Sequence, residues 1–120
     1  MKKYMMIIAV ALLGMGVYAQ DTVKNDYVLE GDLIKATLYH DNGLVSQTGY
    51  YTKKGKLQGQ WTSFDREGVK TAVAQYDNGE KVGKWFFWTG NILREVDYQD
   101  SRIAEVTTYE TVNQRIVSID

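Results

Sequence analysis

The chain has 120 residues, of which 44% are hydrophobic, 12% aromatic and 24% charged, and its formal net charge is −1. This length allows one domain at most, and the absence of cysteine excludes disulfide bonds, thiolate metal sites, a cysteine nucleophile and a lipid anchor on cysteine. The 14 basic residues do not outnumber the 15 acidic ones, so the chain lacks the positive excess that nucleic-acid binding requires.

The first element in chain order has the pattern of a cleavable secretory signal. Lys2 and Lys3 give a positive start, an apolar run covers residues 5–13, and compact residues precede the expected cleavage point after Ala19. A membrane anchor is the alternative, but residues 4–19 contain two glycines and fall short of the ~20 residues that a spanning helix needs. We therefore expect residues 1–19 to be a signal peptide and the mature protein to be exported, to the periplasm or beyond the cell.

The mature chain begins with residues 20–32, which we expect to be a flexible segment. After it, turn glycines recur 12, 13, 11 and 11 residues apart, mostly within short polar clusters, at Gly43, Gly55, Gly68, Gly79 and Gly90. Asn-Gly between apolar runs is a strong hairpin signal, because both residues adopt the positive φ that a tight turn needs. Five evenly spaced turns predict six or seven strands in a meander.

The segments between the turns are rich in aromatic and β-branched residues, which suit a pleated surface, and none has a helical period. The predicted strands cover residues 33–39, 44–51, 61–64, 69–76, 85–88 and 92–98. Residues 103–109 continue the sheet, and residues 110–120 form a C-terminal edge segment in which 115–119 are a last strand or a short helix. The sequence thus predicts an all-β fold, an antiparallel meander of successive β-hairpins over residues 33–109.

Two motifs recur in phase along these strands. The pattern aromatic-x3-Gly-x7-Tyr occurs three times, from Tyr39, Phe64 and Phe86. The pattern Gly-x3-Gly-x-Trp occurs twice, 24 residues apart, and ends in Trp61 and Trp85. One hairpin cannot bury its own aromatic face, so we expect neighbouring hairpins to cover one another's rings. The second glycines of the motif, Gly59 and Gly83, are expected to let a ring or backbone approach closely.

Few residues form patterns that carry chemistry. His40 beside Asp41 resembles a base with its orienting carboxylate, but neighbours on a strand point to opposite faces and Asp41 begins a turn, which favours a turn role. Glu95 and Asp97 share one face of a predicted strand and offer a carboxylate pair, with a solvated face near Arg94 as the favoured alternative. The glycines form no phosphate-binding motif. We assign no catalytic, cofactor-binding or metal-binding residue.

The aromatic side chains are the remaining candidates for recognition. A sheet without a covering helix cannot hide all of them, and tyrosine and tryptophan are favoured at interface hot spots. Trp88 stands out because a regular strand directs it away from Trp85 and Phe87. Core packing is the alternative explanation for these rings. The candidate partner-binding residues are Trp61, Tyr76, Trp85, Trp88 and Tyr98.

Residues 55–61 and 79–85, each followed by aromatic residues and a further glycine, resemble the bacterial MORN-type repeat of the YwqK-like antitoxin family over residues 35–103. The resemblance implies a curved sheet of hairpins that serves as a platform for membranes or protein partners. It points to an exported, non-catalytic module that binds a protein partner, with an antitoxin or immunity role as a special case. A membrane surface and a carbohydrate are alternative partners, whereas we do not expect the protein to bind nucleic acid.

An enzymatic alternative also comes with the resemblance, because relatives of this layout are sometimes described as nicotinic acid mononucleotide adenylyltransferases. Such a nucleotidyltransferase needs an α/β nucleotide fold and a pair of histidines at a helix N-terminus to hold the phosphates. This chain has one histidine, His40, and no alternation of strands and helices. The sequence therefore favours a binding protein without a cofactor.

Overall fold

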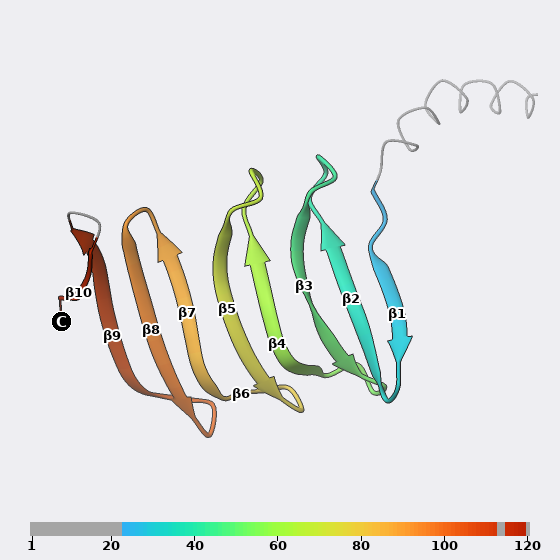
Figure 1. The fold of residues 1–120 in the computed structure, drawn as a ribbon. Helices are drawn as coiled ribbons and strands as arrows, with labels where there is room; N and C mark the ends of the chain where they lie inside the picture. Colours follow the sequence, from blue (N-terminus) through green and yellow to red (C-terminus); the bar gives the residue numbers. More distant parts are fainter. Residues whose placement is uncertain (1–22, 113–114, 120) are drawn as a thin grey trace, which may run out of the picture.

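The computed structural model describes residues 23–112 and 115–119. Within these ranges the chain forms no helix, and ten strands make one antiparallel sheet (Figure 1). The predicted all-β meander of hairpins is thus confirmed. The signal-peptide prediction lies outside the described residues. None of the described residues belongs to a helix long and apolar enough to cross a membrane.

The strands follow one another across the sheet from β1 to β10, except that the short β6 pairs with β5 beside the main path. Their bounds are β1 (Asp26–Glu30), β2 (Leu33–Tyr39), β3 (Val45–Thr52), β4 (Leu57–Phe64), β5 (Lys70–Asp77), β6 (Glu80–Lys81), β7 (Gly83–Thr89), β8 (Ile92–Gln99), β9 (Arg102–Val112) and β10 (Arg115–Ser118). The prediction of six or seven strands is too low, because β1, the short β6 and β10 also form.

The sheet begins earlier than predicted. The segment 20–32, expected to be flexible, contains β1, which pairs with β2 from Asp26↔Thr37 to Glu30↔Leu33. A turn at Gly31 and Asp32 joins the two strands, and Gly31 has a φ of +64°. The start of the repeat domain at residue 33 is therefore too late by one strand.

The structure also decides between the strand and the short helix that the sequence left open for residues 115–119. Residues 115–118 form the edge strand β10, paired with β9, and not a helix. At the preceding hairpin between β8 and β9, Asp100 and Ser101 have φ values of +54° and +63°. They adopt the left-handed conformation that Gly55, Gly79 and the other turn glycines have elsewhere, so the hairpin pattern continues without glycine.

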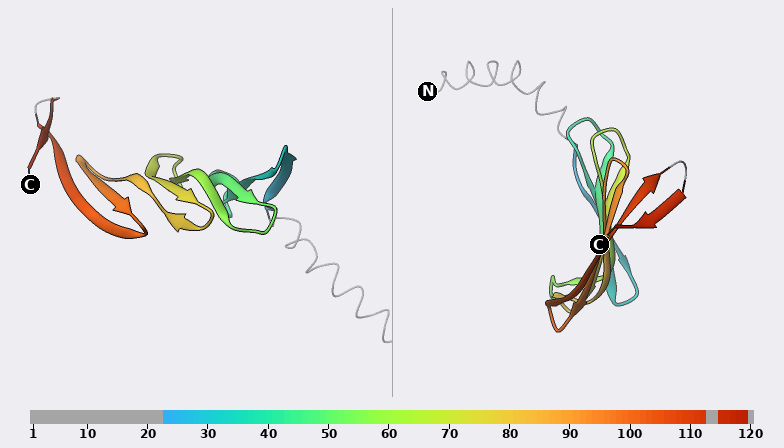
Figure 2. Two further views of the ribbon diagram at one scale, coloured as in Figure 1. Left: turned by 90° about the horizontal axis from the view of Figure 1, so that it is seen from below. Right: turned by 90° about the vertical axis from the view of Figure 1, so that its left-hand side faces the viewer.

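The sheet is a single twisted layer, which is seen nearly edge-on in Figure 2. One face carries Trp61 and Trp85, and we call it the tryptophan face; the other is the opposite face. The core is a row across the tryptophan face, in which Trp61 pairs with Ala74 and Trp85 with Val96. The buried members of this row are Ala36, Trp61, Ala74, Trp85 and Val96.

Candidate functional site

Trp61 on β4 is fixed by three contacts on the tryptophan face. Its indole Nε1–H donates a 2.9 Å hydrogen bond to the carbonyl oxygen of Tyr50, and its ring meets the Tyr51 ring edge-on at 5.0 Å between centroids. A Cβ placed on Gly49 would lie 2.1 Å from Trp61 Cδ2, so the indole fills space that only glycine leaves open. The side chain is 5% exposed, which makes it part of the core.

Trp85 on β7 occupies the equivalent place in the next unit. Its Nε1–H donates to the carbonyl oxygen of Gln75 at 3.0 Å, and the Tyr76 ring lies 5.2 Å away, again edge-on. Two more rings pack against it, those of Tyr98 at 4.9 Å and Phe87 at 6.1 Å. The repeat predicted from the two tryptophan motifs is therefore present in three dimensions.

The motif glycines Gly59 and Gly83 serve a different purpose from the predicted one. No atom lies within 4 Å of a Cβ built on Gly59, and at Gly83 the nearest is the Gln75 side chain at 3.7 Å. Their φ values are +72° and +68°, a region that other residues enter at a cost. Backbone conformation requires these glycines, whereas close approach of a ring is found at Gly49.

The tryptophan face is a packed aromatic row rather than an exposed strip. Tyr76 and Tyr98 are half-buried against Trp85, and the ammonium group of Lys81 lies 5.2 Å from the Trp85 ring and 5.3 Å from the Tyr98 ring. Burial raises the pKa of Tyr76 above its usual 10.0, and the nearby Tyr98 adds to this shift. Four of the five candidate residues, Trp61, Tyr76, Trp85 and Tyr98, thus belong to one packed cluster.

Trp88, the fifth candidate, lies on the opposite face. Its ring stacks with that of Phe86 at 6.1 Å, and the ammonium group of Lys70 lies 5.4 Å from its centroid. Phe86 in turn pairs across the sheet with the buried Val73. The structure therefore separates Trp88 from Trp61, Tyr76, Trp85 and Tyr98, and leaves it half-buried.

The carboxylates of Glu95 and Asp97 share the opposite face, as their spacing predicted. The Lys84 ammonium lies 2.8 Å from Glu95 Oε2 and 3.7 Å from Asp97 Oδ2. These contacts, that with Glu95 above all, hold the pKa of Lys84 above its usual value. Lysine rather than Arg94 is the counter-ion, and among the residues that the structure describes no cluster of three potential ligands is suited to a metal ion.

His40 ties two neighbouring hairpin ends together. Its Nε2 lies 2.9 Å from the carbonyl oxygen of Phe64, and since a carbonyl only accepts, Nε2 carries the proton. The side-chain amide of Asn42 donates to the carbonyl oxygen of Arg66 at 2.9 Å, and Asp41 pairs with the Arg66 guanidinium at 2.6 Å. His40 and Asp41 thus hold the β2–β3 turn to the β4–β5 turn, which fits a turn role.

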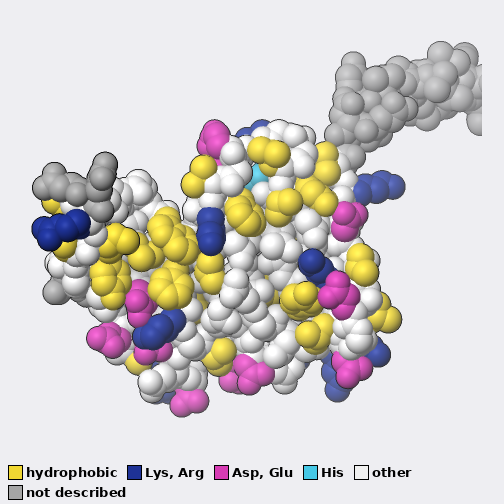
Figure 3. Space-filling model, in the orientation of Figure 1, with side chains coloured by type: hydrophobic (Ala, Val, Ile, Leu, Met, Phe, Trp, Pro, Cys, Tyr) yellow, Lys and Arg dark blue, Asp and Glu magenta, His cyan; other side chains and the backbone are white. Residues whose placement is uncertain are grey.

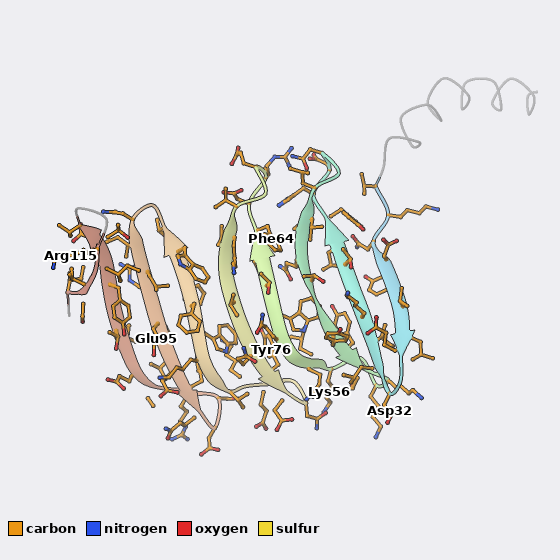
Figure 4. All side chains as sticks on the ribbon, viewed as in Figure 1. Asp32, Lys56, Phe64, Tyr76, Glu95 and Arg115 are labelled. Carbon is orange, nitrogen blue, oxygen red and sulfur yellow. The ribbon has the colours of Figure 1, made fainter. Side chains whose placement is uncertain are left out.

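Between these tied hairpin ends the opposite face is hollowed. Figure 3 shows hydrophobic side chains around the single histidine at this edge of the sheet, and Figure 4 places Phe64 there, far from Tyr76. Leu44 is 45% exposed, and Val69, beside the hollow, is 59% exposed. We call the region the hairpin-end hollow; it is lined by Lys35, Thr37, Leu44, Val45, Thr48, Phe64 and Gly68.

Sequence reasoning missed this hollow, although the chain carries a signal for it. Leu44 directly follows the turn glycine Gly43, and Val69 follows Gly68, at positions where hairpin ends are usually polar. Two apolar residues at matching turns mark an exposed apolar surface. Comparisons with known protein families, with curated proteins and with solved structures found no match to this chain, so the argument for function rests on its own surfaces.

Proposed function

We propose that the protein is an exported, non-catalytic module that binds another protein, and that the partner docks in the hairpin-end hollow. The observation that carries this proposal is the exposure of Leu44, which lines the hollow with Phe64, and of Val69, the chain neighbour of the lining residue Gly68. Apolar side chains gathered on an otherwise mixed surface mark interaction sites, because their burial in a complex removes them from water.

The rigid frame of the hollow supports the same proposal. Each hairpin end closes with a backbone bond, His40 N–H to Leu44 O and Asp65 N–H to Val69 O, both 2.8 Å. The side chains of His40 and Asn42 join one end to the other. A surface that is already ordered loses little conformational freedom on association, which favours affinity.

The charges near the hollow suggest the chemistry of its partner. Lys35 lines it, and no carboxylate does. A partner segment with an apolar side chain next to an acidic one would bury the first against Phe64 and Leu44 and place the second near Lys35. A protein partner fits these features better than a carbohydrate, which would need exposed ring faces, because Trp61 and Trp85 are buried.

This proposal agrees with the expectation from the MORN-type resemblance that hairpin repeats act as a platform for proteins. An antitoxin or immunity role is the special case in which the partner is a toxin in the same compartment. Nucleotidyl transfer receives no support, because the chain has one histidine and its Nε2 is engaged by the Phe64 carbonyl. Incubation with ATP and nicotinate mononucleotide should release no pyrophosphate, and release above that of a buffer control would contradict the proposal.

Site-specific photo-crosslinking in the cell envelope tests the docking site. A photoreactive amino acid at Val69 is compared with one at Ile103, because both positions are 59% exposed and they lie far apart on the sheet. We expect a discrete protein adduct from position 69 that is absent from position 103. The substitution Leu44→Ser should weaken that adduct. Equal adducts from both positions, or an adduct from 69 that Leu44→Ser leaves unchanged, would refute docking in the hollow.

A further inference from the structure

The strand β1 is an open edge of the sheet. It pairs with β2 on one side, and among the residues that the structure describes no strand lies on its other side (Figure 1). All five residues of β1 are exposed, and its three apolar side chains, Tyr27, Val28 and Leu29, are each more than half exposed. Long apolar edge strands that are not covered pair with other strands, because their outward N–H and C=O groups form a ready template.

The turn that precedes β2 determines which backbone groups point outward. Gly31 and Asp32 form a two-residue turn that closes on the pair Glu30↔Leu33. A turn of this length closes on a pair whose backbone groups bond each other, so residues 30, 28 and 26 face β2. The alternate residues Tyr27 and Leu29 direct their N–H and C=O groups to the free edge.

We propose that this edge binds β1 of a second copy of the chain. The strands run antiparallel about a two-fold axis at Tyr27, so that Tyr27 pairs with its own counterpart and Leu29 pairs with Asn25 of the other copy. In this register Lys24 faces Glu30 of the other copy, twice across the axis. Opposite charges that face each other across strands stabilise the pairing.

Charge also disfavours the neighbouring registers. A two-fold axis at Val28 places Asp26 opposite Glu30 of the other copy, which offsets the Lys24–Asp32 pair that this register also forms, and an axis at Leu29 places Asp26 opposite Asp32. An axis at Asp26 brings two copies of that aspartate together. Like charges in directly opposed positions destabilise a sheet, so the acidic residues of β1 select the Tyr27 register rather than prevent pairing.

The other edge of the sheet lacks this complementarity. β10 spans Arg115–Ser118, and Arg115 is its one charged residue. Pairing of β10 with itself therefore brings no acidic group opposite that arginine. The hairpin-end hollow reaches β2 through Lys35 and Thr37, whereas the self-association uses the outer edge of β1, so it goes beyond the proposed function and does not depend on it. Strand pairing alone gives a small interface, so we expect a weak dimer that forms at high concentration.

A charge exchange tests the proposed register. Lys24→Glu and Glu30→Lys each place like charges opposite each other, and we expect each variant to dimerise about 10-fold more weakly than the natural sequence in analytical ultracentrifugation. A mixture of the two variants restores opposite charges at both places and should dimerise about as well as the natural sequence, as should the double variant. Absence of a dimer in the natural chain, or no recovery in the mixture, would overturn the proposal.

Proline substitution supplies a matched comparison of the two edges. Leu29→Pro removes an outward N–H from β1, and Ile116→Pro does the same to β10, where the pair Val112↔Arg115 closes the hairpin. We expect Leu29→Pro to abolish the dimer and Ile116→Pro to retain it, with far-UV circular dichroism to confirm that both sheets are intact. Loss of the dimer in both folded variants, or in neither, would contradict pairing through β1.

Discussion

The two tryptophan units, one around Trp61 and one around Trp85, bury equivalent indole rings against different neighbours. In the first, Trp61 lies over Gly49, and Leu57 packs at the margin of the ring cluster. In the second, Trp85 has Ala74 at the place of Gly49, and Lys81 stands where Leu57 does, with its ammonium group over Trp85. Both indoles nevertheless bond a carbonyl of the preceding strand and meet a tyrosine edge-on.

The difference shows that the repeat preserves the position of the ring rather than its surroundings. A β-bulge, where β4 has extra residues opposite Gly49 of β3, precedes Trp61 and contains Gly59. Gly83 precedes Trp85 in the same way, and the two glycines have nearly the same φ although their neighbours differ. In the second unit the bulge at Val82 divides β6 from β7, which together correspond to β4. The Trp85 unit has two additional ring partners, Tyr98 on the neighbouring strand β8 and Phe87 on β7 itself.

Removal of each indole is the strongest test of this comparison. Trp85→Ala should lower the free energy of unfolding by about 4 kcal/mol, and Trp61→Ala by about 3 kcal/mol, because three rings pack on Trp85 and one on Trp61. Urea unfolding followed by circular dichroism measures both values. A larger loss for Trp61→Ala would show that the ring partners do not determine the order.

An exchange of the small residues beneath the rings gives the next largest effect. Gly49→Ala should cost about 3 kcal/mol, because the new methyl group would overlap the Trp61 ring and force it to move. Ala74→Gly in the other unit should cost about 1 kcal/mol, mainly through the greater freedom of glycine in the unfolded chain. Thermal unfolding compares the two, and equal losses would mean that Trp61 readily adopts the geometry of Trp85.

The bulge glycines should respond alike in both units. Gly59→Ala and Gly83→Ala should each cost about 1 kcal/mol, because alanine is strained at a φ near +70° while neither site lacks room. Chemical denaturation of the two variants checks the prediction. A loss at Gly83 several times that at Gly59 would indicate close packing at Gly83 after all.

Lys81 occupies the place in the second unit that Leu57 has in the first, and changing it should have a smaller effect on stability. Lys81→Gln removes the charge over Trp85 and Tyr98, and we expect a loss of about 0.5 kcal/mol. Lys81→Leu, which introduces the side chain of the first unit, should restore most of that loss. Paired urea titrations measure both variants, and a large gain from Lys81→Gln would contradict a favourable contact between the ammonium group and the rings.

The smallest effect is the pH dependence that Tyr76 gives to the second unit. Burial and the neighbouring Tyr98 raise the pKa of Tyr76 above 10.0, so the fold favours the neutral phenol. The resulting stability is complete below pH 10.0 and is lost as the pH rises through the folded-state value. The free energy of unfolding, measured across this pH range, should fall less steeply for Tyr76→Phe than for the natural chain. Identical slopes would contradict the assignment to Tyr76.

The candidate site shows where inference from sequence reached its limit. The tryptophan motifs located Trp61 and Trp85 correctly within the repeat, but the absence of a covering helix suggested exposed rings. Gly49 lies in the middle of a strand rather than at a turn. It was the available sign that the Trp61 ring packs directly against the backbone of the sheet. The missed strand β1 has a similar explanation, because polar residues on both sides obscure its three apolar ones.

The sequence by itself determined the hairpins and their repetition, because a turn depends on the conformations that a few adjacent residues adopt. Turn glycines at even intervals were enough to indicate the meander. The tertiary structure alone decided which aromatic rings are covered and where the hairpin-end hollow lies. Those outcomes depend on the register of each strand against the next, and on the contact between the turns of His40 and Phe64, which are 24 residues apart.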